Sequence, residues 1–191
     1  MLAMTRGPQW VLPGRAVGLA VLGILASLGI ACSGASEDNA VERGRLEGSL
    51  ATWKQLVQAQ GDTYSYVVPT SSFTGWVSRT GLQVEAGVVT YRRYESSTVG
   101  PTGALLPATL QWEERAGAVG SHQAGAFPST IDALYQRCAN EVLTKSPDTN
   151  VIAFGLDDRN LLATCTFRPK NCQDDCAMGV LITELQLGKT Y

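Results

Sequence analysis

Residues 130–145 read TIDALYQRCANEVLTK, and their pattern predicts an amphipathic helix. Apolar side chains recur at intervals of three and four residues, as the buried face of a helix requires. Those positions are Ile131, Leu134, Tyr135, Cys138 and Val142. Ser129 or Thr130 is the candidate N-cap, and Asp132 suits the first turn of a helix. We therefore expect Cys138 on the core side of this helix.

The segments after this helix predict strands. In residues 161–168, LLATCTFR, alternate side chains form the more apolar face, so Cys165 is expected to point inward. Residues 151–154 predict a preceding strand. Residues 179–187 predict the partner strand of a hairpin with 161–168, in which Cys165 lies near Ile182.

Four cysteines lie in this half of the chain, at Cys138, Cys165, Cys172 and Cys176. Four cysteines allow three pairings. A Cys138–Cys165 bridge would join the helix to the sheet, and a Cys172–Cys176 bridge would close the tip of the hairpin. A metal site is the alternative, but the spacing is Cys-x3-Cys and the single histidine, His122, is distant in sequence. The pattern therefore favours two disulfides and no metal.

The region before residue 130 predicts a helix followed by strands. A helix is predicted at 48–60, with Trp53 on its apolar face, and Gly87 suits the positive φ of a hairpin turn. Strands are predicted at 64–68, 76–84, 88–94 and 109–114, with loops at 96–108 and 115–128. The order helix, strands, helix, strands predicts an α+β domain of antiparallel meanders, held by disulfides.

The N-terminal segment predicts export from a bacterial cell. Residues 1–15 contain Arg6 and Arg15 and no acid, and residues 16–31 are uncharged and apolar or small. A basic start, a short apolar run and a small-residue boundary are typical of a secretory signal. The apolar run ends at Cys32.

Cys32 after Ala31 resembles the site at which bacterial lipoproteins receive a fatty acyl group such as palmitate. We expect residues 1–31 to be a signal peptide, 32–47 a lipidated N-terminus with a flexible tether, and 48–191 a single domain. Cleavage near Ala35 without a lipid, which would give a secreted protein, and an uncleaved membrane anchor are the alternatives. The expected location is the cell envelope, with the chain held on a membrane through its lipid.

Composition and charge argue against nucleic-acid binding. Of 191 residues, 15 are basic and 17 acidic, which gives a formal net charge of −2, and no block of like charge is present. Proteins that bind nucleic acids need clustered Lys and Arg to replace the counterions of the phosphates. No nucleotide-binding glycine motif is present either, so we expect no nucleic-acid partner and no cofactor.

Several landmarks fall in an order that resembles a family of uncharacterised, often lipid-anchored bacterial proteins. They are Trp53 in the first helix, Tyr64-Ser65-Tyr66, the hairpin at 84–89, Thr130–Tyr135 at the start of the second helix, and a closing meander. The family is catalogued as domain of unknown function 6174. The resemblance covers about residues 50–187 and implies export and an α+β domain; it implies no catalytic residues.

The candidate catalytic groups do not form a recognisable pattern. A Ser121–His122 pair is conceivable, but an exposed loop histidine is the simpler interpretation. Asp157-Asp158 and Asp174-Asp175 lie where turns are expected, and Asp is favoured in turns. The sequence therefore predicts no catalytic residue.

The Tyr91-Arg92-Arg93-Tyr94 stretch is the best candidate for a partner surface, because interfaces favour Tyr and Arg. The expected function is a non-enzymatic binding or structural domain of the envelope. An inhibitor or accessory subunit of an exported enzyme is the alternative.

Overall fold

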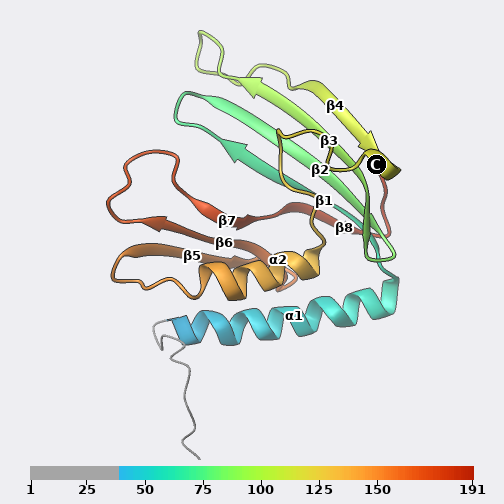
Figure 1. Cartoon of the computed structure of the whole chain (residues 1–191), viewed down its shortest axis with the longest axis vertical. Helices are drawn as coiled ribbons and strands as arrows, with labels where there is room; N and C mark the ends of the chain where they lie inside the picture. Colours follow the sequence, from blue (N-terminus) through green and yellow to red (C-terminus); the bar gives the residue numbers. More distant parts are fainter. Residues whose placement is uncertain (1–38) are drawn as a thin grey trace, which may run out of the picture. The chain divides into compact units, whose positions relative to one another are not determined.

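The computed structural model describes residues 39–191 (Figure 1). Within this range the chain forms two α-helices and eight strands, and the strands pair antiparallel in two sheets. The predicted α+β class is confirmed. The predicted signal peptide, Cys32 and residues 33–38 lie outside the described residues. No helix of the described part is long and apolar enough to cross a membrane.

The first sheet is a four-stranded meander with a fifth strand from the end of the chain. Its order is β4-β3-β2-β1-β8. The strands are β1 Thr63–Ser71, β2 Trp76–Glu85, β3 Val88–Thr98, β4 Thr109–Arg115 and β8 Thr183–Leu187. The turn between β2 and β3 has positive φ at Gly87, as the sequence predicts, and also at Ala86. The predicted loop at 96–108 begins too early, because β3 continues to Thr98 opposite Trp76.

The second sheet contains β5 Asn150–Leu156, β6 Leu162–Pro169 and β7 Met178–Leu181, in the order β5-β6-β7. The prediction of one strand at 179–187 is wrong. Ile182 separates β7 from β8, and the two strands belong to different sheets. Ile182 is itself buried, and its N–H donates to the carbonyl of Ala163 at 2.8 Å.

The predicted register of the hairpin is wrong as well. Cys165 lies opposite Val180 instead of near Ile182. After Ile182 the chain leaves the second sheet, and Glu184 adopts a φ of +54° at the start of β8. One continuous segment therefore joins the two sheets.

The two helices lie side by side (Figure 1). They are α1 Ala40–Gln60 and α2 Ile131–Arg137, and α2 continues as a π-helical turn at Cys138–Val142. Thr130 is the N-cap of α2, since its side chain accepts a hydrogen bond from the N–H of Ala133. The single α-helix predicted over 130–145 is thus shorter than expected and changes its hydrogen-bonding pattern at Cys138.

The predicted start of the first helix is wrong. Residues 40–47, which the sequence assigns to a tether, are the first turns of α1. Leu46 is buried there, and Asn39 immediately before the helix is only 3% exposed. Gly44 and Gly48 lower the intrinsic helix propensity of this stretch, so local sequence did not indicate it. Tertiary contacts stabilise it instead.

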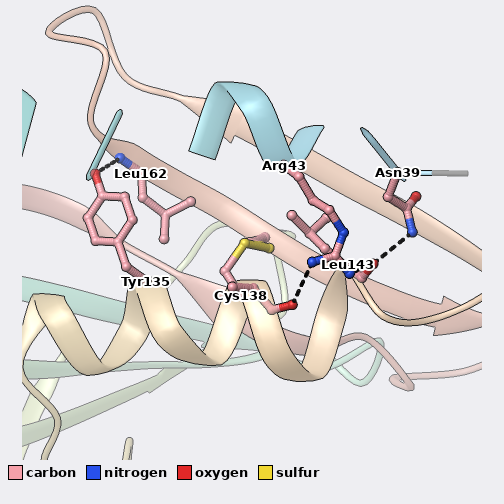
Figure 2. The surroundings of a disulfide bond; sticks show 8 residues. Asn39, Arg43, Tyr135, Cys138, Leu143 and Leu162 are labelled. Atoms are coloured by element: carbon pink, nitrogen blue, oxygen red, sulfur yellow. Dashed lines mark hydrogen bonds between the residues drawn. A yellow bond between two sulfur atoms is a disulfide. The ribbon is translucent and has the colours of Figure 1, made fainter. Parts of the chain in front are cut away.

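These contacts provide hydrogen-bond donors for the backbone carbonyls at the end of the second helix. The last carbonyls of a helix lack partners within it. The amide nitrogen of Asn39 donates to the carbonyls of Leu143 at 3.1 Å and Lys145 at 3.0 Å. The guanidinium of Arg43 also donates to the Leu143 carbonyl, at 2.6 Å (Figure 2).

Buried tyrosines connect the helices to both sheets. The Tyr135 hydroxyl accepts from the N–H of Leu162 in β6 at 3.0 Å and is bonded to Ser49 of α1 at 2.6 Å. The Tyr64 hydroxyl of β1 accepts from the N–H of Ile131 at 3.0 Å. Burial raises the pKa of Tyr135. One core cluster takes residues from both helices and both sheets.

The cysteines of the domain pair as the sequence predicts. Cys138 is bonded to Cys165, with their Cα atoms 5.6 Å apart, and both side chains are fully buried. Figure 2 shows this disulfide between the second helix and the neighbouring elements. Cys172 is bonded to Cys176 in the loop between β6 and β7, with a Cα separation of 6.3 Å.

Candidate functional site

The stretch predicted as a partner surface does not form one surface. Successive residues of a strand point to opposite faces of the sheet. Arg92 and Tyr94 face the core side, where they are 2% and 7% exposed. Tyr91 and Arg93 face the other side, where the C-terminal Tyr191 packs against both. The prediction of a surface at 91–94 is therefore wrong.

Arg92 forms a buried ion pair with Glu114 on the adjacent strand β4. Its Nε donates to Oε2 of Glu114 at 2.8 Å, and its Nη2 donates to Oε1 at 3.0 Å. The two side chains are 2% and 1% exposed. Such a two-pronged contact matches the planar guanidinium to the carboxylate.

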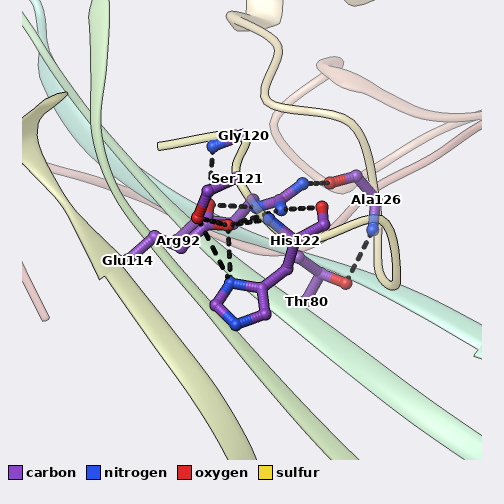
Figure 3. Close-up of polar contacts among 7 residues, drawn as sticks. All are labelled: Thr80, Arg92, Glu114, Gly120, Ser121, His122 and Ala126. Carbon is purple, nitrogen blue, oxygen red and sulfur yellow. Dashed lines mark hydrogen bonds and ion pairs between the residues drawn. The ribbon is translucent and has the colours of Figure 1, made fainter. Parts of the chain in front are cut away.

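Arg92 and Glu114 also form hydrogen bonds with the loop that follows β4 (Figure 3). The Glu114 carboxylate accepts from the backbone N–H groups of Gly120 and His122, each at 2.6 Å, and from the Ser121 hydroxyl at 3.0 Å. Arg92 donates to the carbonyl of His122 at 2.6 Å. Residues 120–122 are thus held on the sheet by one carboxylate and one guanidinium.

A column of stacked rings covers this network. The Tyr94 and Trp112 rings are 5.3 Å apart with 14° between their planes. Trp112 and His122 are 4.5 Å apart with 5° between their planes. The guanidinium of Arg92 lies 4.6 Å from the centre of the Trp112 ring, a cation–π contact. Apolar and aromatic atoms therefore shield the ion pair from water.

The electrostatics of Glu114 follow from these contacts. Burial alone would raise the pKa of the Glu114 carboxyl, but hydrogen bonds from Arg92 and from the backbone of His122 and Gly120 outweigh it. They hold that pKa well below its usual range. Glu114 is therefore ionised in the folded protein at all ordinary pH values.

Ser121 and His122 lie close together but not as a nucleophile and its base. In a catalytic triad the carboxylate holds one ring nitrogen and the serine approaches the other. Here Nδ1 of His122 faces Glu114 at 2.9 Å, and the Ser121 hydroxyl lies 3.4 Å from that same nitrogen. The Ser121 hydroxyl is itself bonded to Glu114. The arrangement holds the loop at residues 120–122 in place, and it does not place a base where it would activate the Ser121 hydroxyl.

The predicted turn aspartates differ in what they contact. Asp157 accepts from the N–H groups of Arg159 at 3.0 Å and Leu161 at 2.8 Å, so it stabilises the β5–β6 turn as predicted. Asp175 accepts from the N–H of Phe73 at 3.1 Å, which joins the β6–β7 loop to the β1–β2 turn. Among residues 39–191, no group of three or more metal-ligating side chains is present.

A groove separates the two sheets where β7 and β1 diverge. It has a volume of about 450 Å³ and is lined by Val68, Pro69, Thr70, Ser71, Val77, Thr166, Ala177, Gly179 and Leu181. A second hollow of about 190 Å³ borders four of the same residues and extends to Phe127 and Leu134. None of the side chains lining the larger groove is charged.

Two strand edges without strand partners border this groove. β8 pairs with β1 only as far as Val67, so residues 68–71 have no partner on that side among the described strands. β7 is the edge strand of the second sheet. The Val67 carbonyl faces β8 and the Ile182 N–H faces β6. The backbone N–H and C=O groups of successive strand residues point to opposite neighbouring strands. Ser71 therefore points to the same side of β1 as Val67, beyond the end of β8, and Leu181 points away from β6. The backbone groups of both residues face the groove.

Sequence reasoning missed the groove and the Arg92–Glu114 pair for different reasons. The groove exists because the chain changes sheets at Ile182, which no local pattern indicates. The ion pair had a weak signal, since Arg92 and Glu114 both fall in segments predicted as strands, but the sequence did not indicate that the two residues lie opposite each other.

Comparisons of the chain with protein-family models, with curated proteins and with solved structures found no match. The resemblance to domain of unknown function 6174 stays a hypothesis.

Proposed function

We propose that this chain is an exported envelope lipoprotein, anchored through a lipid on Cys32, whose domain binds another envelope protein and catalyses no reaction. The observation that carries the proposal is the distribution of cysteines. The four cysteines of the domain form two disulfides, and the fifth, Cys32, directly follows the apolar N-terminal run. Disulfides persist in compartments outside the cytosol. Both features suit a protein that is secreted and then held at a membrane.

Metabolic labelling with a fatty-acid probe tests the anchor. We expect the chain to be labelled and to fractionate with membranes, and we expect Cys32→Ala to lose both properties because it removes the acceptor thiol. Ser33→Ala is the matched control and should keep the label. Labelling that persists in Cys32→Ala would contradict the proposal. An unlabelled chain that is released from the cell would favour simple secretion.

The groove between β1 and β7 is the proposed binding site, and its occupant is an extended segment of the partner protein. An extended segment offers backbone N–H and C=O groups at the spacing of a strand, which the free edges of β1 and β7 can pair with. The apolar side chains of Val68, Val77 and Leu181 would contact alternate side chains of that segment. A small soluble ligand would leave these backbone groups unpaired.

A photo-reactive amino acid at Leu181 tests this site in cells. Leu110 on β4 is the matched control, since it is also an exposed leucine on a strand, at 47% against 38%. We expect cross-links from position 181, mapped by peptide mass spectrometry to one short segment of one envelope protein, and none from 110. A synthetic peptide of that segment should bind the chain, and Leu181→Asp should abolish binding. Equal cross-linking from both positions, or none, would refute the groove as the site.

A further inference from the structure

The hairpin between β3 and β4 ends in an uncharged, apolar tip. We define the tip as residues 99–108; in Figure 1 it is the uppermost loop, beyond the body of the sheet. No charged residue occurs between Ser96 and Trp112. Leu105 is 58% exposed and Leu106 is 50% exposed, and Val99 is exposed as well. Together these side chains give the protruding loop an apolar surface that an apolar partner can contact.

Hydrogen bonds within the hairpin satisfy several of the backbone N–H and C=O groups of the tip. The N–H of Gly100 donates to the carbonyl of Ala104 at 2.7 Å, and the N–H of Gly103 donates to Gly100 at 2.9 Å. The N–H of Leu106 donates to Thr98 at 3.0 Å. Pro101 and Pro107 have no N–H to satisfy. Unpaired backbone groups are what normally keeps a loop out of hydrocarbon, so the tip can enter an apolar phase at reduced cost.

The tip and the start of α1 both lie on the left side of Figure 1, the tip at the top and α1 at the bottom. Hydrogen bonds link the segments of this side one after another. The linked pairs are Asn39 with Lys145, Thr149 with Lys170, Asp175 with Phe73, and Gly75 with Val99. In Figure 1 these loops and the beginning of α1 all lie on the left. Phe73, on the neighbouring turn, is 76% exposed.

The turns at the opposite end of the domain contain charged residues. Its turns contain Asp62 and Glu85 beside the β2–β3 hairpin, and Asp157, Asp158 and Arg159 between β5 and β6. These charged turns suit water. The tip differs from these turns in having no charged residue and two adjacent exposed leucines.

We propose that the tip inserts into the interface of the bilayer that holds Cys32, so that the domain rests on the membrane through both contacts. This inference depends on the proposed lipid anchor. Six residues separate Cys32 from Asn39, and even fully extended they span at most about 25 Å. The buried Asn39 therefore keeps the start of α1 near the lipid surface.

Tryptophan fluorescence with brominated lipids tests the insertion. The chain isolated from cells is placed in vesicles of phosphatidylethanolamine and phosphatidylglycerol, with or without bromine on the acyl chains. We expect Leu105→Trp to show blue-shifted emission and added quenching by the brominated lipids relative to the parent chain. Val88→Trp is the matched control: Val88 is 62% exposed on a hairpin at the opposite end, and its variant should show no added quenching.

The outcomes separate this proposal from the lipid anchor. A chain that stays in the vesicles while neither variant gains quenching overturns the insertion and leaves the anchor intact. If the chain is isolated without a lipid, the same vesicles are added to the soluble protein. Added quenching of Leu105→Trp then still supports insertion, and its absence refutes it. A blue shift that depends on protein concentration without vesicles would identify a second copy as the partner, and would also refute insertion.

Discussion

Arg92 and Glu114 are charged side chains on the core face of a sheet, where water does not reach them. An isolated buried charge is very unfavourable, so each depends on the other and on the loop that covers them. Six hydrogen bonds from Arg92, Gly120, Ser121 and His122 converge on the Glu114 carboxylate. The pair therefore determines where residues 120–122 lie.

We expect Glu114→Gln to lower the free energy of unfolding at neutral pH by about 3–5 kcal/mol, because it leaves the Arg92 guanidinium buried without a counter-charge. Urea unfolding at pH 7 measures this. Glu113→Gln is the matched control on the same strand; its side chain is more exposed, so its loss should be much smaller. Equal losses in both variants would contradict the assigned importance of the buried pair.

The effect of Glu114→Gln should depend on pH. The pKa of Glu114 is lowered in the folded state from an ordinary value of 4.5. Its stabilising contribution is then fully present above pH 4.5 and is lost as the pH falls below it, because the unfolded chain takes up the proton first. The difference in stability between the parent and Glu114→Gln should shrink as the pH is lowered from 5 toward 2. A constant difference over that range would refute the assignment.

At the scale of elements, the helices stabilise each other at their ends. α1 has no side-chain N-cap of its own, but Asn39 donates to the free carbonyls that follow the second helix. This contact explains why α1 begins at Ala40 although Gly44 and Gly48 disfavour helix there. The boundaries of α1 are therefore a tertiary property.

We expect Asn39→Ala to lower the free energy of unfolding by about 1–3 kcal/mol, since the carbonyls of Leu143 and Lys145 lose a donor. Hydrogen exchange followed by mass spectrometry should show faster exchange in the first turns of α1 and after Val142. Glu47→Ala, at an exposed position of the same helix, is the control and should change neither quantity. Unchanged exchange in Asn39→Ala would show that Leu46 and Arg43 alone fix the start of the helix.

Alternation of apolar and polar residues predicted some strands correctly but could not predict which sheet a strand joins. Alternation located β1, β2 and β6 and placed Cys165 inward, because the direction of side chains along a strand depends only on position. It did not detect the break at Ile182, since the residues on both sides of it favour strand equally. Which sheet each half joins depends on partners distant in the sequence.

At the scale of the whole molecule, Cys138–Cys165 joins the second helix to the second sheet within the common core. Its sequence separation is 27 residues, against 4 for Cys172–Cys176. A disulfide stabilises mainly by limiting the freedom of the unfolded chain, and the effect grows with the length of the closed loop. The two bridges should therefore differ in their contribution.

We expect the double substitution Cys138→Ala, Cys165→Ala to lower the free energy of unfolding by about 3–4 kcal/mol. The matched double substitution Cys172→Ala, Cys176→Ala should cost about 2 kcal/mol or less, because its loop is short and exposed. Urea unfolding without reductant compares the two. A larger loss for the 172–176 pair would mean that the loop contact between Asp175 and Phe73 contributes more than the core bridge.

The sequence by itself determined the α+β class and the approximate elements, and it favoured the cysteine pairing that the structure shows. The class and the elements follow from the period of apolar residues, which is a property of each segment alone. Only the tertiary structure decided the burial of Arg92, the start of α1, the change of sheet at Ile182 and the groove that results. Each of these depends on side chains or edges from distant segments meeting in space, and no local pattern records which segments will meet.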